Sequence, residues 1–156
     1  MRTFQFDYDN LPGIANMYAI PVDNFISVTK DNSGQDQISL KDSENAIMIP
    51  IIKNESFSFT ENSEITDAGI TYTPEISGII PHNRLVNVPL IDELIDGEWL
   101  LLFQDSNGSC YLAGSVEVPL RFTYKAQTNA INGIKFTFTS VQSERAKILN
   151  TSSLSF

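Results

Sequence analysis

The sequence predicts a mainly β protein, built as an antiparallel β-sandwich or a small barrel with one flanking α-helix. Short runs in which apolar and polar residues alternate recur along the 156 residues, as expected for sheets with one buried face. Asn-Gly pairs and other turn residues separate these runs. Only one segment, at about residues 87–96, has the spacing of a helix.

Four runs carry the alternation, with apolar residues on one face and polar residues on the other. They are 56–60 (SFSFT), 70–73 (ITYT), 120–126 (LRFTYKA) and 134–139 (IKFTFT). We therefore expect four half-buried strands, each with one face on a core and the other on water or a partner.

Two further runs are continuously apolar. Trp99–Phe103 predicts a central strand that is covered on both faces. Ile47–Ile52 contains Pro50, which cannot donate a hydrogen bond to a neighbouring strand. This run is therefore expected to be an edge strand or to carry a bulge.

Turn residues connect the runs. Asp105–Gly108 lies between the Trp99 strand and an apolar run at Cys110–Ala113, and its Asn-Gly pair predicts a hairpin with a type I′ turn. Asn132-Gly133 predicts a second, looser hairpin before the strand that starts at Ile134. Asn32–Gly34 marks another turn.

The helix has recognisable ends. Asn87 can cap it, Pro89 is tolerated in its first turn, and Gly97 can end it. The stripe expected to face the protein comprises Val88, Ile91 and Ile95, with Leu90 and Leu94 beside it. A helix of about ten residues is marginal alone, so it should cover a sheet face.

Composition limits the function. We expect one domain over residues 1–149 and a polar tail over 150–156. The net charge of −9 argues against specific nucleic-acid binding and against binding to anionic membranes. No stretch approaches 18 apolar residues, and the acidic N-terminal segment does not resemble a signal peptide.

The residues that could carry chemistry are few. His82 is the single histidine and no G-x-S-x-G motif is present, which argues against a metal centre and a Ser-His-Asp triad. Cys110 is the single cysteine, so an internal disulfide is excluded, and it is expected to be a buried strand residue. We expect no cofactor.

Acidic residues give no stronger signal. The acids Asp92, Glu93, Asp96 and Glu98 are candidates for glycoside hydrolysis, but a solvated helix face explains them better, because nothing marks an apolar pocket around one acid. Asp105 starts a sequence similar to a calcium loop, yet Val116 occupies the position where an EF-hand needs Glu. The sequence therefore predicts no catalytic, cofactor-binding or metal-binding residue, and we expect a protein that is not an enzyme.

A resemblance covers about half of the chain, from Tyr72 to about Ser143. The segments that carry it are Thr73–Gly78, Glu98–Phe103, Asp105–Gly108, Leu112–Ser115, Pro119–Tyr124 and Asn132–Phe138. This order resembles small virion proteins encoded in the structural modules of tailed phages and prophages of Bacteroidetes. The resemblance implies a tail-completion, tail-terminator or tube-like protein of the tail or neck, with a sandwich or barrel fold, that forms rings.

Three functions follow from these observations. The first is a structural virion protein at the tail or head–tail junction, made in the host cytoplasm, whose partners are other copies of itself and neighbouring virion proteins. The run Ile47–Ile52 and the hairpin near Asn129 are the candidate contacts between subunits. The second is a carbohydrate- or protein-binding β-sandwich module, and the third is a carboxylate-dependent glycosidase that would need an acid such as Glu98.

Overall fold

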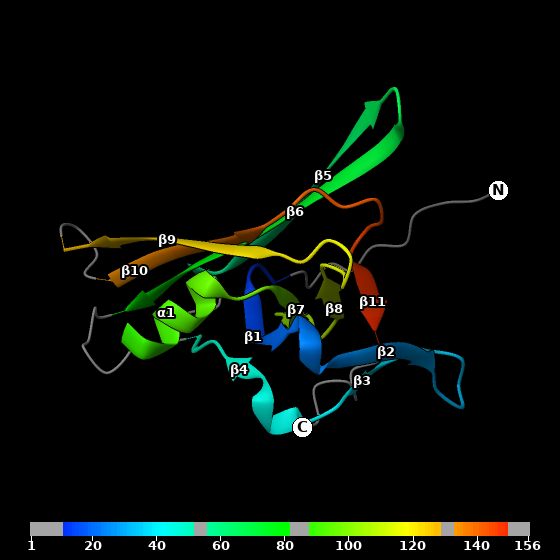
Figure 1. The fold of residues 1–156 in the computed structure, drawn as a ribbon, viewed down its shortest axis with the longest axis horizontal. Helices are drawn as coiled ribbons and strands as arrows, with labels where there is room; N and C mark the ends of the chain where they lie inside the picture. Colours follow the sequence, from blue (N-terminus) through cyan, green and yellow to red (C-terminus); the bar gives the residue numbers. More distant parts are fainter. Residues whose placement is uncertain (1–10, 52–55, 82–87, 129–132, 150–156) are drawn as a thin grey trace.

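The computed structural model describes residues 11–51, 56–81, 88–128 and 133–149 of the chain. These residues form three antiparallel sheets and one short α-helix (Figure 1). The prediction of a mainly β fold with one flanking helix is therefore confirmed. Of the two architectures expected, the sandwich is present, because the described strands do not close into a barrel.

Two larger sheets face each other, and a ribbon covers one of them. The five-stranded sheet runs in the order β11 (Lys147–Leu149), β8 (Cys110–Ala113), β7 (Trp99–Asp105), β1 (Ile14–Pro21) and β4 (Ile47–Met48). The four-stranded sheet runs β5 (Ser58–Thr66), β6 (Gly69–Pro81), β10 (Gly133–Thr139) and β9 (Arg121–Gln127). The ribbon pairs β2 (Phe25–Lys30) with β3 (Asp36–Leu40). Short 3₁₀ turns at Val22–Asn24 and Ser43–Asn45 precede β2 and β4.

Strand β7 lies between two cores, as its continuous apolar run predicted. Trp99, Leu101 and Phe103 face the four-stranded sheet, where they join its buried phenylalanines. Leu100 and Leu102 point the other way, into a second core beneath the ribbon. Because successive side chains of a strand alternate in direction, a strand covered on both faces needs apolar residues at every position.

The run at Ile47–Ile52 forms an edge strand, as expected. Ile47 pairs with Ala19 and Met48 pairs with Tyr18, after which the strand ends before Pro50. The backbone N–H of Ile49 still donates to Met17 O, at 3.0 Å. Ile52 lies outside the described residues.

Helix α1 spans Val88–Asp96, close to the expected limits, but a different stripe is buried. Ile91 and Leu94 join the main core, whereas Val88 and Ile95 are 39% and 40% exposed. Gly97 follows the helix without adopting a positive φ. Its role is to let the Trp99 ring approach, since a Cβ at this position would overlap that ring. The expected cap, Asn87, lies outside the described residues.

The hairpin between β7 and β8 exists, but its turn differs from the expected type I′. The N–H of Gly108 donates to Asp105 O at 3.1 Å, and the N–H of Asp105 donates to Ser109 O at 2.9 Å. The loop is therefore three residues long, with Gly108 as its positive-φ residue. The turn at Asn32–Gly34 repeats this geometry, with Gly34 in the equivalent place. Asn132 lies outside the described residues.

Alternation is confirmed in β10 and only partly elsewhere. Ile134, Phe136 and Phe138 are all buried, with Lys135 exposed between them. In β9, by contrast, Phe122 is buried but Tyr124 is 46% exposed. The alternating pattern of these strands thus continues beyond the part of the sheet that covers the core.

A tight contact inside the four-stranded sheet gives the first prediction. A Cβ on Gly78 would overlap the buried ring of Phe57, so Gly78→Ala should lower the free energy of unfolding by about 1–3 kcal/mol, the usual cost of overpacking. Urea denaturation measures this change. The matched control is Ser77→Ala, on the opposite face of the same strand, which should cost no more than about 0.5 kcal/mol. Equal losses in the two variants would contradict the steric explanation.

Candidate functional site

A β-hairpin projects from the body of the protein. Residues 61–73 of β5 and β6, here called the arm, extend beyond the two larger sheets (Figure 1). Every residue from 62 to 70 is exposed. Ile65 and Ile70 face each other across the hairpin and are 85% and 51% exposed. Exposed apolar pairs at the end of a projecting hairpin are typical of a contact surface.

The arm is attached at its base. Tyr72 exchanges two backbone hydrogen bonds with Gln142, at 2.8 and 2.7 Å. The backbone N–H of Ala146 donates to Glu61 Oε2 at 2.8 Å. Further out, the described strands pair with the arm only through its own two halves. The base is therefore fixed in direction while the remainder of the arm stands in solvent.

Gln142 is the residue that connects the arm to the rest of the protein. It is only 6% exposed, and its side-chain amide donates to Val118 O at 2.7 Å and to the Ser140 hydroxyl. Its Oε1 accepts from Ser115 Oγ at 3.3 Å. A buried amide with all these partners is held in place, and removing it would remove three side-chain hydrogen bonds at once.

The two edges of the four-stranded sheet carry opposite charges. The arm, which contains the outer half of edge strand β5, has the acids Glu61, Glu64 and Asp67 and no cation. The opposite edge strand, β9, has Arg121 and Lys125 and no acid. Edge strands with unpaired backbone groups are templates for pairing with another chain.

The structure describes only one of the two subunit contacts that the sequence predicted. In the run at Ile47–Ile52, Ile49 is buried and Met48 is 59% exposed, so one large apolar side chain of β4 is presented to solvent. Asn129 lies outside the described residues. The sequence interpretation missed the arm, although β5 and β6 are longer than the usual five or six residues, which is a signal that strands extend past a core.

An open cavity of about 570 Å³ lies between β2, the loop at residues 114–118 and the segment at residues 142–147. Its walls include apolar side chains such as Phe25 and Val116 and charged ones such as Glu117 and Arg145. Its volume is within the range of small-molecule sites. The described residues that line it form no cluster of metal ligands.

The residues considered for chemistry are placed apart. Cys110 is fully buried on β8, and burial, reinforced by the negative charge of Asp105, raises the pKa of its thiol. The helix acids Asp92, Glu93 and Asp96 are exposed, and Glu98 forms an ion pair with Arg121 at 2.5 Å. Their arrangement matches the solvated-face interpretation. His82 lies outside the described residues.

The segment similar to a calcium loop is used as a turn. Asp105 Oδ1 accepts hydrogen bonds from the backbone N–H groups of Asn107 and Ser109, each at 2.9 Å. Burial is the main cause that raises the pKa of the Tyr111 hydroxyl, and the negative charge of Asp105 raises it further. Within the described ranges, no group of three or more His, Cys, Asp or Glu side chains is placed to hold a metal ion. In the same ranges, no helix has the length and apolar character needed to cross a membrane.

Comparisons with protein families, with curated proteins and with solved structures found no match to this chain.

The role of Gln142 gives the second prediction. Gln142→Met keeps the side chain's length but removes the amide, so Val118 O loses the closest of its donors and the hydroxyls of Ser115 and Ser140 lose their hydrogen bonds to the amide. We expect the free energy of unfolding in urea to fall by about 1–3 kcal/mol. The control is Gln37→Met in the ribbon, where the expected change is within about 0.5 kcal/mol. Equal effects would show that the amide of Gln142 has no special structural role.

The raised pKa of Cys110 gives the third prediction. Since the folded protein keeps this thiol protonated to higher pH than the unfolded chain, its contribution to stability is complete at lower pH and is lost above about pH 9. Cys110→Ala lacks this contribution. The difference in unfolding free energy between wild type and Cys110→Ala should therefore narrow between about pH 8 and pH 10 in urea titrations under reducing conditions. If the difference in unfolding free energy stays constant or widens over this pH range, the prediction is wrong.

Proposed function

We propose that this protein is a non-enzymatic structural component of a phage or prophage virion, at the tail or the head–tail junction, and that it acts by assembling with further copies of itself. The observation that carries the proposal is the arm, with Ile65 and Ile70 exposed at its outer end. Supporting it, no described strand pairs with the outer sides of the two edge strands of the four-stranded sheet, and these edge strands differ in charge. The sequence resemblance supplies the virion context.

Physical arguments favour assembly over chemistry. A soluble β protein usually shortens, covers or charges its exposed strand edges, because open edges promote association. Here a nine-residue edge strand extends past the core with a large apolar residue near its end. The carboxylates considered for catalysis lie on an exposed helix and in a surface ion pair, which does not provide the differing environments of a general acid and base.

The cavity of about 570 Å³ favours the second candidate, a ligand-binding module. It has the size of a small-molecule site, and its lining combines apolar and charged side chains. This candidate predicts a monomer whose ligand contacts the loop at residues 114–118.

The fourth prediction separates the two candidates. Light scattering over a concentration series should show association that increases with concentration, and negative-stain images of the largest species should show closed rings of about six subunits. A monomer at every concentration would contradict self-assembly and favour the binding module. The virion context has its own check, because mass spectrometry of particles purified from the strain that carries the gene should detect this chain. Its absence from those particles would contradict a virion role.

A further inference from the structure

We propose that the arm of one copy pairs with the outer edge of β9 in a second copy, in the register that places Glu64 opposite Lys125 and Ile65 opposite Tyr124. This inference rests on the proposed function, because it names the two surfaces through which self-assembly would proceed. It is carried by four observations: strand direction, edge charge, backbone phase and side-chain register.

Strand direction permits the pairing. The order β5-β6-β10-β9 is antiparallel throughout, so β5 and β9 run in opposite directions at the two edges of the sheet. A second copy in the same orientation therefore presents its β5 antiparallel to β9 of the first. The sheet would continue from one copy to the next with its alternation unbroken.

Charge selects this pairing over symmetric ones. Two β9 edges placed together would bring only cations into the contact, and two arms would bring only acids. Like charges directly across a strand pair are destabilising, whereas opposite charges stabilise it. Of the three contacts, only the head-to-tail one brings the acids of the arm together with the cations of β9.

The backbone groups of the two edges are in phase. Leu120 exchanges both of its backbone hydrogen bonds with Trp99, so its N–H and C=O point away from β10. Backbone groups of a strand point in the same direction at every second residue, so those of Tyr124 also point away from β10. On the arm, Tyr72 directs its backbone groups to Gln142, away from β5. Ser63 stands opposite Tyr72 in β5, so its backbone N–H and C=O point away from β6. Ile65 is two residues further along, and its backbone groups point in the same direction. Ile65 and Tyr124 can thus exchange both backbone hydrogen bonds.

Side-chain direction fixes the register. Ile65 lies on the same face of β5 as Phe59, and Tyr124 on the same face of β9 as Phe122, which is the face toward the core. Glu64 and Lys125 lie on the outer face. When Glu64 stands opposite Lys125, Ile65 necessarily stands opposite Tyr124, and one register satisfies both the charge pair and the apolar pair.

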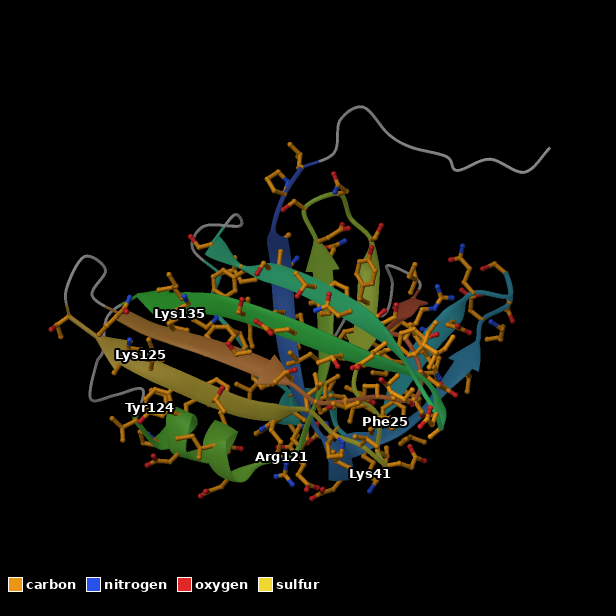
Figure 2. All side chains as sticks on the ribbon, turned by 90° about the horizontal axis from the view of Figure 1, so that it is seen from above. Phe25, Lys41, Arg121, Tyr124, Lys125 and Lys135 are labelled. Carbon is orange, nitrogen blue, oxygen red and sulfur yellow. The ribbon has the colours of Figure 1, made fainter. Side chains whose placement is uncertain are left out.

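Lys125 is available for such a contact. It is exposed and stands directly opposite Lys135 within its own sheet, near one end of that sheet (Figure 2). Among the described residues neither lysine forms an ion pair, whereas Arg121, near the other end of β9, is already paired with Glu98. An acid from a second copy would offset the repulsion between the two lysines.

The shape of the protein fits a head-to-tail contact. The arm extends past the body, so its strand edge is presented to other molecules away from the two larger sheets (Figure 1). Helix α1 contacts β9 and contributes Ile91 and Leu94 to the core, while no described strand pairs with β9 on the side away from β10. Each copy offers one arm and one β9 edge, and such contacts generate rings when the rotation between copies closes.

Charge reversal with rescue tests the pairing, and is the fifth prediction. Glu64→Lys and Lys125→Glu should each raise the concentration at half-assembly by about tenfold, and the double variant should return it to near the wild-type value. Glu117→Lys and Lys41→Glu make the same changes of charge on exposed residues away from both edges and should have little effect. Light scattering gives the assembly concentrations, and urea denaturation shows whether each variant is folded.

A disulfide test is independent of charge. Thr66 and Thr123 would be directly opposite in this register, so a mixture of Thr66→Cys and Thr123→Cys proteins should form a disulfide-linked dimer under mild oxidation. Thr137→Cys is the control for Thr123→Cys, because Thr137 lies one strand further from the edge, beyond the reach of a disulfide. If the wild-type protein assembles but charge reversal has no effect, or the specific cross-link does not form, the proposed pairing is overturned while self-assembly stands. A wild-type protein that stays monomeric would overturn both.

Discussion

The burial of β7 on both faces is the constraint on which the architecture depends. Alternate residues of this strand serve two different cores, one under the four-stranded sheet and one under the ribbon. At its first residue, Trp99 also donates its indole N–H to Leu94 O at 2.9 Å, which satisfies a carbonyl in the last turn of the helix. The same residue pairs with Leu120 and so connects the five-stranded sheet to the start of β9. One strand thereby positions both larger sheets, the ribbon and the helix.

Much of this arrangement can be predicted from the sequence because it depends on local patterns. The continuous run at Trp99–Phe103 specifies burial on two faces, and Pro50 specifies the end of an edge strand. The alternation at Ile134–Thr139 and the hairpin at Asp105–Gly108 are equally local. The spacing of apolar residues also predicted that a helix forms at about residues 87–96, but it did not predict which side of that helix is buried. Which side of a short helix is covered is decided by tertiary packing, here against Trp99 and Phe122.

The arm could not be predicted for the same reason. Ile65 and Ile70 alternate with polar residues just as the buried residues of β10 do, and alternation does not reveal where the opposing sheet ends. The anchor of the arm is similarly hidden, since Gln142 is a polar residue whose partners include residues of two distant segments, β6 and the loop at residues 114–118. Sequence patterns report which face of a strand is apolar. Only the assembled sheets show whether that face is covered by the same chain or is left for another molecule.

The topology also determines when the fold can be completed. Strand β1 is near the start of the chain, and its long pairing is with β7, where Asn16 and Gln104 contact each other across 88 positions of sequence. The arm and the β9–β10 hairpin, by contrast, pair segments that are adjacent in the chain. At the usual rates of synthesis, β1 waits on the order of 5–15 s for its main partner to be made. Hairpins of the outer sheet should thus form early and the central sheet last. During that interval the newly made chain presents an apolar strand next to unprotected edges, so its folding and its assembly compete for the same backbone groups.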